Sequence, residues 1–306
     1  MLLKFCVAEF LQEKQFKNLS NYTIKMYKTN LTEFNEYCLS NQVLNVNDVK
    51  RTIVKSYLHY IREDKKNKIS TTNNKIRSLK TFFNYLIEEE IISESENPMK
   101  KVKQIKDDIN IPIPTDEQIM KVIRYYERYT RKNQFVGIRN RHLVITLIST
   151  GIRRSEIATL KWSNINFVHQ TISVFGKKRK QVAVPMSNKL KKEMASYKVF
   201  CEQKFGHLPE YVFCTQYGEG MSIEGVTTIF KRLAKIMDFK NCRLSAHSFR
   251  HVFVARSLQS GMDAMTLKSI LHHETLQMTS RYANIFGVAL KEQNEKHNPL
   301  NYFDID

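Results

Sequence analysis

The stretch STGIRRSEIATL, residues 149–160, holds a glycine between two segments of helical character. The apolar run RNRHLVITLIST leads into it, and Gly151 is the residue type that most often ends a helix. A second helix then begins, with Arg153 and Arg154 at its N-terminus, where anions are favoured and an arginine adds a forked donor for phosphate oxygens. The alternative is that these arginines form surface ion pairs, for instance with Glu156. The stretch alone leaves both interpretations open.

Composition favours a polyanionic partner. The chain has 306 residues, of which 42% are hydrophobic, so we expect two domains that each bury a core. There are 49 Lys and Arg against 30 Asp and Glu, a net charge of +19, and nucleic acid is the commonest partner of so basic a chain. A membrane-surface protein is the rival, but the sequence contains no amphipathic anchor or lipidation signal.

The cysteines and the N-terminus indicate a cytoplasmic protein. Five scattered cysteines without a C-x-x-C pair argue against a disulfide framework and against a cysteine-rich zinc site. The N-terminus reaches Glu9 before its apolar run is long enough for a signal peptide, and no run approaches membrane-spanning length. We therefore expect a cytoplasmic, nucleoid-associated protein with no membrane partner.

Residues 1–105 carry helical periodicity throughout. Apolar residues recur at three- and four-residue intervals in SNYTIKMYKTNLTEFNEYCL, VNDVKRTIVKSYLHYIRED and STTNNKIRSLKTFFNYLIEEEII, and Ser20 is placed to cap the first of these helices. In the third segment Lys75, Arg77 and Lys80 stand between apolar positions. They could line a DNA backbone or belong to an ordinary solvated face, and the basic excess along the whole chain favours DNA.

A proline-bracketed stretch separates this helical part from the rest of the chain. NPMKKVKQIKDDINIPIPTDEQI combines three prolines with a basic run, so residues 106–114 are expected to form a linker, and Thr115 is expected to cap a new helix. Further on, TISVF and QVAVPM alternate in polarity and predict a β-hairpin, while EYVFCT suggests a short strand.

The hairpin has a basic tip. GKKRK places Lys177, Lys178 and Arg179 on an exposed turn. Such a tip usually contacts phosphate, although a lysine held beside an anion could instead donate a proton to a leaving oxygen. The sequence does not decide between these two roles.

Histidines and a tyrosine complete the set of candidates. In LSAHSFRHVFVARSL, His247 and Arg250 are three residues apart and share a helical face. His247 and His251 have a spacing that metal ligands use, but the sequence offers no third ligand and no H-E-x-x-H pattern, so a metal site is disfavoured. ILHHETLQMTSRYANI adds His273 and Tyr282. Such a tyrosine is ordinarily half-buried, but with cationic neighbours it could be a nucleophile for phosphoryl transfer.

Taken in order, these motifs resemble those of the tyrosine recombinase (phage integrase) family. That family is marked by a TG-x-R-x-x-E box, a hairpin lysine, H-x-x-R, and a histidine followed nine residues later by tyrosine. The chain shows TGIRRSEI, GKK, HSFR and LHHETLQMTSRY in that order. Each motif is weak alone, but the ordered set is specific, and the resemblance extends over nearly the full chain.

The resemblance implies a mainly α fold with a small β-sheet. Residues 1–105 would form a SAM-like helical core-binding domain, 106–114 a linker, and 115–306 a mixed α+β catalytic domain. Its tail, about 286–306, resembles the terminal helix of Xer-type members, which docks onto a neighbouring protomer. Because the core-binding domain would occupy residues 1–105, no room is expected for an additional arm-site-binding domain. The chain therefore resembles compact Xer proteins or mobile-element integrases.

The same resemblance implies a mechanism. Tyr282 would attack a DNA phosphodiester to form a 3′-phosphotyrosyl bond and free a 5′-hydroxyl. Arg153 and Arg250 would clamp the non-bridging oxygens. Because the covalent bond conserves energy, neither metal nor ATP would be required. Strand exchange would join two double-stranded DNA sites within a homotetramer, with or without a second recombinase as partner.

Supporting roles follow for the remaining motif residues. Lys177 would be the acid for the 5′-oxygen, and His247 would assist proton transfer near the tyrosine. His273 would donate a hydrogen bond to phosphate, and Glu156 would orient the arginine box. The chain departs from the family where His272 replaces a common glycine, and the nine-residue spacing selects His273 as the phosphate contact. A second departure is Val252, which stands where the family usually has threonine, and little effect on chemistry is expected from it.

Three rival functions remain on sequence grounds. A type IB topoisomerase uses the same kind of site but would relax supercoils as a monomer. A non-catalytic DNA-binding protein would explain the charge but would make the ordered motif series a coincidence. A metal-dependent nuclease is least favoured, because no acidic cluster accompanies the histidines. The target DNA and the biological task, whether dimer resolution or element integration and excision, are not encoded in these motifs.

Overall fold

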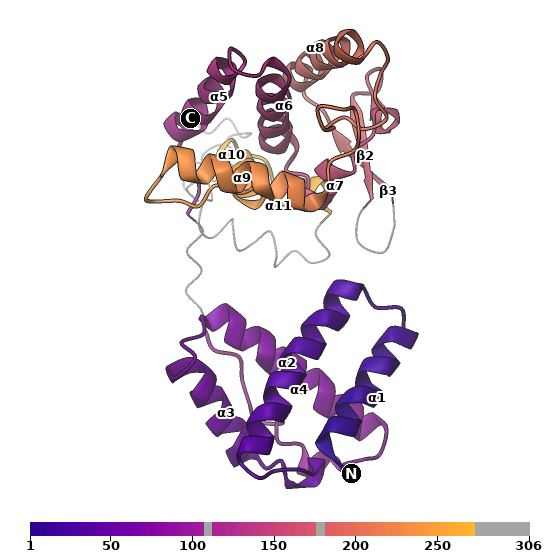
Figure 1. The fold of residues 1–306 in the computed structure, drawn as a ribbon, viewed down its shortest axis with the longest axis vertical. Helices are drawn as coiled ribbons and strands as arrows, with labels where there is room; N and C mark the ends of the chain where they lie inside the picture. Colours follow the sequence, from indigo (N-terminus) through magenta and orange to yellow (C-terminus); the bar gives the residue numbers. More distant parts are fainter. Residues whose placement is uncertain (107–111, 176–180, 273–306) are drawn as a thin grey trace, which may run out of the picture. The chain divides into compact units, whose positions relative to one another are not determined.

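The structure is a computed structural model that describes residues 1–106, 112–175 and 181–272. The chain divides into two compact units, Met1–Ile109 and Asn110–Asp306, called here the N-terminal and C-terminal units (Figure 1). The helices of the N-terminal unit are α1 (Leu3–Phe16), α2 (Asn21–Ser40), η1 (Val46–Asp48), α3 (Arg51–Glu63), α4 (Ile69–Glu88) and η2 (Glu94–Glu96).

The described elements of the C-terminal unit are mostly helical as well. In chain order they are α5 (Asp116–Tyr129), α6 (Gln134–Thr150), α7 (Arg154–Ala158), η3 (Trp162–Asn164), β1 (Ile165–Asn166), β2 (Thr171–Phe175), β3 (Gln181–Pro185), α8 (Asn188–Phe205), α9 (Ile223–Met237), α10 (Ala246–Gln259) and α11 (Ala264–Leu271). The predicted fold class, mainly helical with a small sheet, is confirmed. No helix in the described residues combines the length and apolar composition needed to cross a membrane.

Aromatic packing holds the N-terminal unit together. The ring of Phe10 on α1 is fully buried and meets Tyr27, Phe82 and Tyr85 in edge-to-face contacts, with centroids 5.2–5.6 Å apart. Such pairs add about 0.5–1.5 kcal/mol each beyond the area they bury. Ser20 caps α2 as predicted, since its hydroxyl accepts a hydrogen bond from the Thr23 N–H at 3.2 Å. The helices of this unit are therefore fixed by shared core side chains and by local caps.

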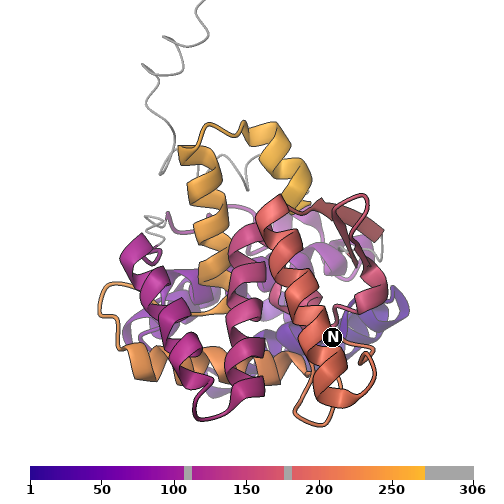
Figure 2. The ribbon, with the colours of Figure 1, turned by 90° about the horizontal axis from the view of Figure 1, so that it is seen from above.

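Helix α6 is the centre of the C-terminal unit. It lies between α5 and α8 (Figure 2), and α10 packs against it. Thr115 caps α5 as predicted, and it forms a capping box with Gln118 through bonds of 3.2 and 3.0 Å. At the other end, Gly151 ends α6 with a φ of 62°, and a Cβ at this position would lie 2.4 Å from the ring of Phe253. Glycine is therefore required there by both backbone conformation and packing.

The sheet has three antiparallel strands in the order β1-β2-β3. The predicted hairpin strands are confirmed as β2 and β3, which pair Ser173 with Ala183, while Ile172 and Val184 face the core. β1 was not predicted because it is only two residues long. The EYVFCT segment does not form a strand. It makes only single bridges, one of them between Lys161 and Tyr211, because the chain turns away after each contact instead of running alongside a neighbour.

Candidate active site

The two motif arginines meet where three helices end or begin. Arg250, on the second turn of α10, donates from Nη1 to the Gly151 carbonyl at 2.5 Å and from Nη2 to the Leu271 carbonyl at 3.0 Å. Arg153, the N-cap of α7, donates from Nη2 to the carbonyl of His272 at 3.4 Å. These carbonyls belong to the C-terminal ends of α6 and α11, where the helix dipole is negative and backbone oxygens lack helical partners. Both guanidinium groups are thus held by the ends of other helices.

Glu156 fixes Arg153 from the other side. Its Oε1 accepts from Arg153 Nη1 at 2.7 Å, and its Oε2 accepts from the Arg153 backbone N–H at 2.6 Å. The Glu156 side chain is 5% exposed, whereas that of Arg153 is 29% exposed. The ion pair considered from the sequence therefore exists, and it positions a guanidinium that remains accessible. Arg154 does not join this pair, and its Nη1 donates to Thr227 Oγ1 at 2.8 Å.

Two histidines on α10 lie beside these arginines. The rings of His247 and His251 have centroids 4.1 Å apart at an angle of 64°. Partial removal from water, together with the charges of Arg250 and Arg153, lowers the pKa of His247. Burial, then His247 and Arg250, lowers the pKa of His251 to about 4. Near pH 7 the imidazole of His247 is therefore neutral and able to accept a proton.

His251 should make stability depend on pH. Its pKa of about 4 in the folded protein lies below the ordinary value of 6.5, so between these values the unfolded chain binds more protons than the folded one. The free energy of unfolding should therefore fall as the pH is lowered from about 7 towards 4. In H251N the free energy of unfolding of the C-terminal unit, measured by urea denaturation, should fall less steeply as the pH is lowered over this range. An identical pH dependence in both proteins would contradict this assignment.

His272 occupies a backbone position that suits glycine. As the C-cap of α11 it has φ 51° and ψ 47°, the left-handed conformation. A glycine would adopt this conformation without the strain that a Cβ adds. Its Nε2 is buried and has no hydrogen-bond partner in the described part of the chain. Burial, Arg153 and Arg250 lower the pKa of His272, although Glu156 acts in the opposite direction.

Substitution of His272 tests this conformation. H272G and H272A both remove the imidazole and differ mainly in how well they tolerate a positive φ. H272G should be more stable than H272A by about 1 kcal/mol, because a left-handed residue with a Cβ is strained by about 1–2 kcal/mol. Thermal unfolding of the two variants measures the difference. Equal stability, or a more stable alanine variant, would show that residue 272 does not adopt this conformation in solution.

The structure brings together part of the predicted site. Arg153, Glu156, His247 and Arg250 converge as described above. Five other predicted residues lie outside the described residues: Lys177, Lys178, Arg179, His273 and Tyr282. The carbonyl anchors of the arginines were not foreseen, because every residue carries a carbonyl and no side-chain pattern marks these.

The predicted DNA contacts on α4 need one correction. Lys75 is only 6% exposed, and its ammonium is paired with the Glu33 carboxylate of α2, so the expectation that it lies on an exposed face is wrong. The physical reason is its spacing from Thr72 and Leu79, which places it on the buried side of the helix. Arg77 is exposed and donates to Asn74 Oδ1 at 3.1 Å, while Lys80 is half-buried.

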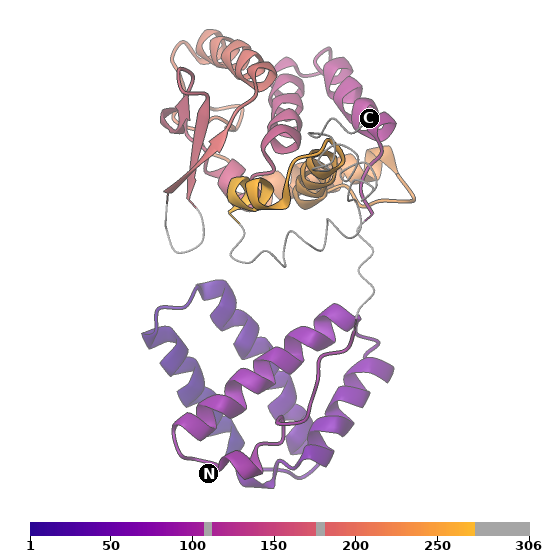
Figure 3. The same ribbon diagram turned by 180° about the vertical axis from the view of Figure 1, so that it is seen from behind.

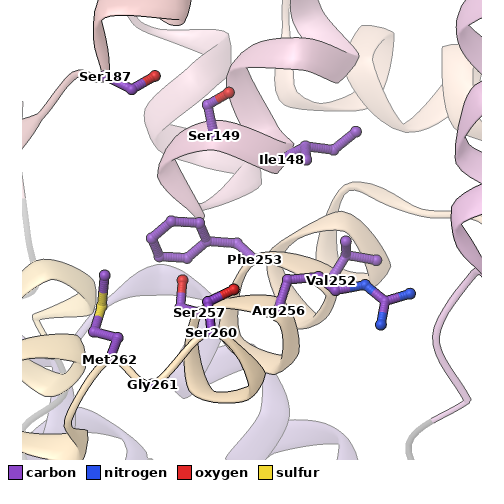
Figure 4. A pocket seen from close by; sticks show the side chains of 10 residues that line it. All are labelled: Ile148, Ser149, Ser187, Val252, Phe253, Arg256, Ser257, Ser260, Gly261 and Met262. Atoms are coloured by element: carbon purple, nitrogen blue, oxygen red, sulfur yellow. The ribbon is translucent and has the colours of Figure 1, made fainter.

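A hollow of about 550 Å³ is lined by residues of α6 and α10 and by the loop that follows α10. Figure 4 shows the ring of Phe253 in its middle and the guanidinium of Arg256 directed away from the hydroxyls of Ser257 and Ser260. Arg256 is also paired with Asp116 at 2.6 Å. Because its cation is engaged elsewhere and its centre is apolar, this hollow lacks the arrangement that an anion needs.

Comparison with known proteins identifies the family. Residues 115–287 match the phage integrase family, and residues 7–93 match the phage integrase N-terminal SAM-like domain. The chain belongs to the phage integrase family. It is thus a tyrosine recombinase, one of the enzymes that break and rejoin DNA strands, and the family predicted from its ordered motifs is confirmed.

Relatives of this recombinase cover nearly its full length. The tyrosine recombinase XerC of Anoxybacillus flavithermus is 28% identical over 284 residues, which is 90% of this chain and 91% of the relative. XerC of Staphylococcus aureus is 27% identical over 285 residues, 90% of each chain. Among solved structures, the Tn1549 transposon integrase in complex with transposon right end DNA has a TM-score of 0.76 at 20% identity, covering 98% of this chain and 100% of that one. XerH bound to its palindromic difH substrate has a TM-score of 0.72 at 19% identity, covering 94% and 82%. These two structures share the fold.

Proposed function

We propose that this recombinase cleaves DNA through Tyr282, forming a 3′-phosphotyrosyl bond and releasing a 5′-hydroxyl that later attacks the same or a partner strand. The observation that carries the proposal is the convergence of Arg153 and Arg250 on one place, each anchored by helix-terminal carbonyls. A phosphate there would meet donors that are already oriented. Such preorganised donors stabilise the charge that develops on the phosphate in the transition state.

The neighbouring groups divide the proton transfers between them. His247, neutral at pH 7 beside the arginines, accepts the proton of the tyrosine hydroxyl as it attacks. Lys177 donates a proton to the departing 5′-oxygen, and His273 donates a hydrogen bond to the phosphate. Glu156 acts through Arg153, whose guanidinium it holds in place. Attack by the 5′-hydroxyl reverses these transfers and frees the tyrosine.

The energetics and the assembly follow from the covalent intermediate. Because the phosphotyrosyl bond retains the energy of the cleaved phosphodiester, rejoining needs neither ATP nor a metal ion. The partners are two double-stranded DNA sites in the cytoplasm, held by a homotetramer. The DNA-bound complexes of the Tn1549 integrase and XerH support this choice of partner.

A suicide substrate tests the proposal. Duplex DNA recovered from sites that the protein occupies in cells is nicked next to the cleavage position, so that the released fragment diffuses away and the covalent species accumulates. A protein–DNA adduct that resists denaturant should form equally with and without a chelator. No adduct would overturn the recombinase mechanism, and an adduct that the chelator prevents would overturn the metal-free chemistry. Relaxation of supercoiled DNA by monomers without site preference would instead indicate a topoisomerase.

A further inference from the structure

Asn73 of α4 holds the chain that leads out of the N-terminal unit. Its Nδ2 donates to the carbonyl of Ile105 at 2.9 Å, and the N–H of Ile105 donates back to its Oδ1 at 2.9 Å. The Asn73 side chain is buried, at 7% exposure, although Ile105 itself is 37% exposed. One amide thus satisfies both backbone groups of a single residue, as a neighbouring β-strand would.

These two bonds are the last attachment of that segment. The chain after η2 runs back beside α4 (Figure 3), and Val102 is its last buried residue before the described part ends at residue 106. Within residues 1–106, no other hydrogen bond holds residues 103–106. The position of this segment on α4 therefore depends on Asn73.

The attached segment is strongly basic. Lys101, Lys103 and Lys106 are all exposed, and residues 97–106 contain no acidic side chain. One turn along α4 from Asn73, the guanidinium of Arg77 is also exposed. Lysines on a freely moving chain would lose conformational entropy when they bind phosphate, whereas lysines on a fixed chain have already lost part of it.

We propose that Asn73 is a positioning residue that holds Lys103 and Lys106 on the surface of α4 as a contact for the DNA phosphate backbone. This rests on the proposed function only in that DNA is the ligand. Preorganisation of this strip raises DNA affinity without any base contact.

The first test uses the full-length protein and a nonspecific DNA duplex. N73A should speed amide hydrogen exchange at Ile105 and weaken binding about tenfold, because the ordering of the strip must then occur on binding. The slope of log affinity against log salt should also become smaller, since fewer phosphates are neutralised. N74A is the matched control, since Asn74 is exposed and its side-chain oxygen accepts from Arg77 rather than from Ile105, and it should leave exchange at Ile105 unchanged. Unchanged exchange at Ile105 in N73A would overturn the proposal.

A second variant acts from the other side of the contact. I105P removes the N–H that donates to Asn73 but keeps the buried side-chain amide of Asn73. The proposal can therefore still be tested if N73A fails to fold. I105P should weaken DNA binding as N73A does, and the double variant should be no weaker than either alone.

A double-mutant cycle completes the design. K103Q/K106Q should weaken binding in the wild type and much less in the N73A background. Full additivity of N73A and K103Q/K106Q would overturn the proposal. Nonspecific DNA binding does not need Tyr282. A failure of the recombinase mechanism would appear in the covalent-adduct assay, whereas a failure of the Asn73 contact would appear in the binding assay.

Discussion

Replacing Tyr282 with phenylalanine is expected to abolish the covalent protein–DNA species while leaving DNA affinity unchanged. The substitution removes one oxygen, the proposed nucleophile, and keeps the ring. Without that oxygen no phosphotyrosyl bond can form, whatever the arrangement of the arginines. The measurement is adduct formation on the suicide substrate under denaturing electrophoresis, beside DNA affinity from native gels.

Y217F is the matched control for this experiment. Tyr217 lies in the same unit and is 78% exposed, so loss of its hydroxyl should leave adduct formation at the wild-type level. An undiminished adduct in Y282F would refute the assignment of the nucleophile. Loss of DNA binding in Y282F would show that the hydroxyl serves recognition rather than attack.

Local signals made much of the fold predictable. Ser20 and Thr115 cap helices because their side chains bond backbone N–H groups three residues ahead, an interaction that depends only on nearby sequence. Gly151 likewise ends α6 because its backbone requires a positive φ. The strands β2 and β3 were visible for a similar reason, since the alternation of apolar and polar residues along each of them is a local pattern with the two-residue period of a strand.

Contacts between distant segments were not predictable in this way. Lys75 has the spacing of a core residue on α4, but only the fold shows that Glu33, 42 residues earlier, lies opposite it to neutralise its charge. Asn73 is one of several polar residues in the same helix, and nothing near it in the sequence indicates that it bonds Ile105. The partners in such pairs have no local pattern, so the sequence alone does not identify either contact.

The candidate site likewise contains some groups that the sequence marks and others that it does not. The order and spacing of the motifs identified Arg153, Glu156, His247 and Arg250, and these do converge. The backbone oxygens that hold the arginines carried no sequence signal. His272 did carry a sequence signal, because it stands where the motif commonly has glycine. Its left-handed backbone is the conformation that glycine adopts most easily.

Arg250 is expected to be the next most sensitive residue after the nucleophile. R250K keeps a positive charge, but a single ammonium cannot span the carbonyls of Gly151 and Leu271 while also presenting a fork to phosphate. We expect the single-turnover cleavage rate at saturating protein to fall about 10²–10³-fold, as for loss of a preorganised transition-state donor. R154K is the matched control, because Arg154 neighbours the site but bonds Thr227 instead, and its rate at saturation should stay near wild type.

The comparison of R250K with R250A separates chemistry from folding. Arg250 is 6% exposed, so R250A leaves two buried carbonyls without their donor and should lower the free energy of unfolding by about 1–3 kcal/mol. The lysine of R250K can still reach one carbonyl, so this variant should lose less stability than R250A. Its cleavage rate should nevertheless fall nearly as far as that of R250A. If cleavage instead tracked stability across the two variants, Arg250 would be a structural tie between α6 and α11. A rate lost in R250K with its stability largely kept would place the guanidinium on the phosphate.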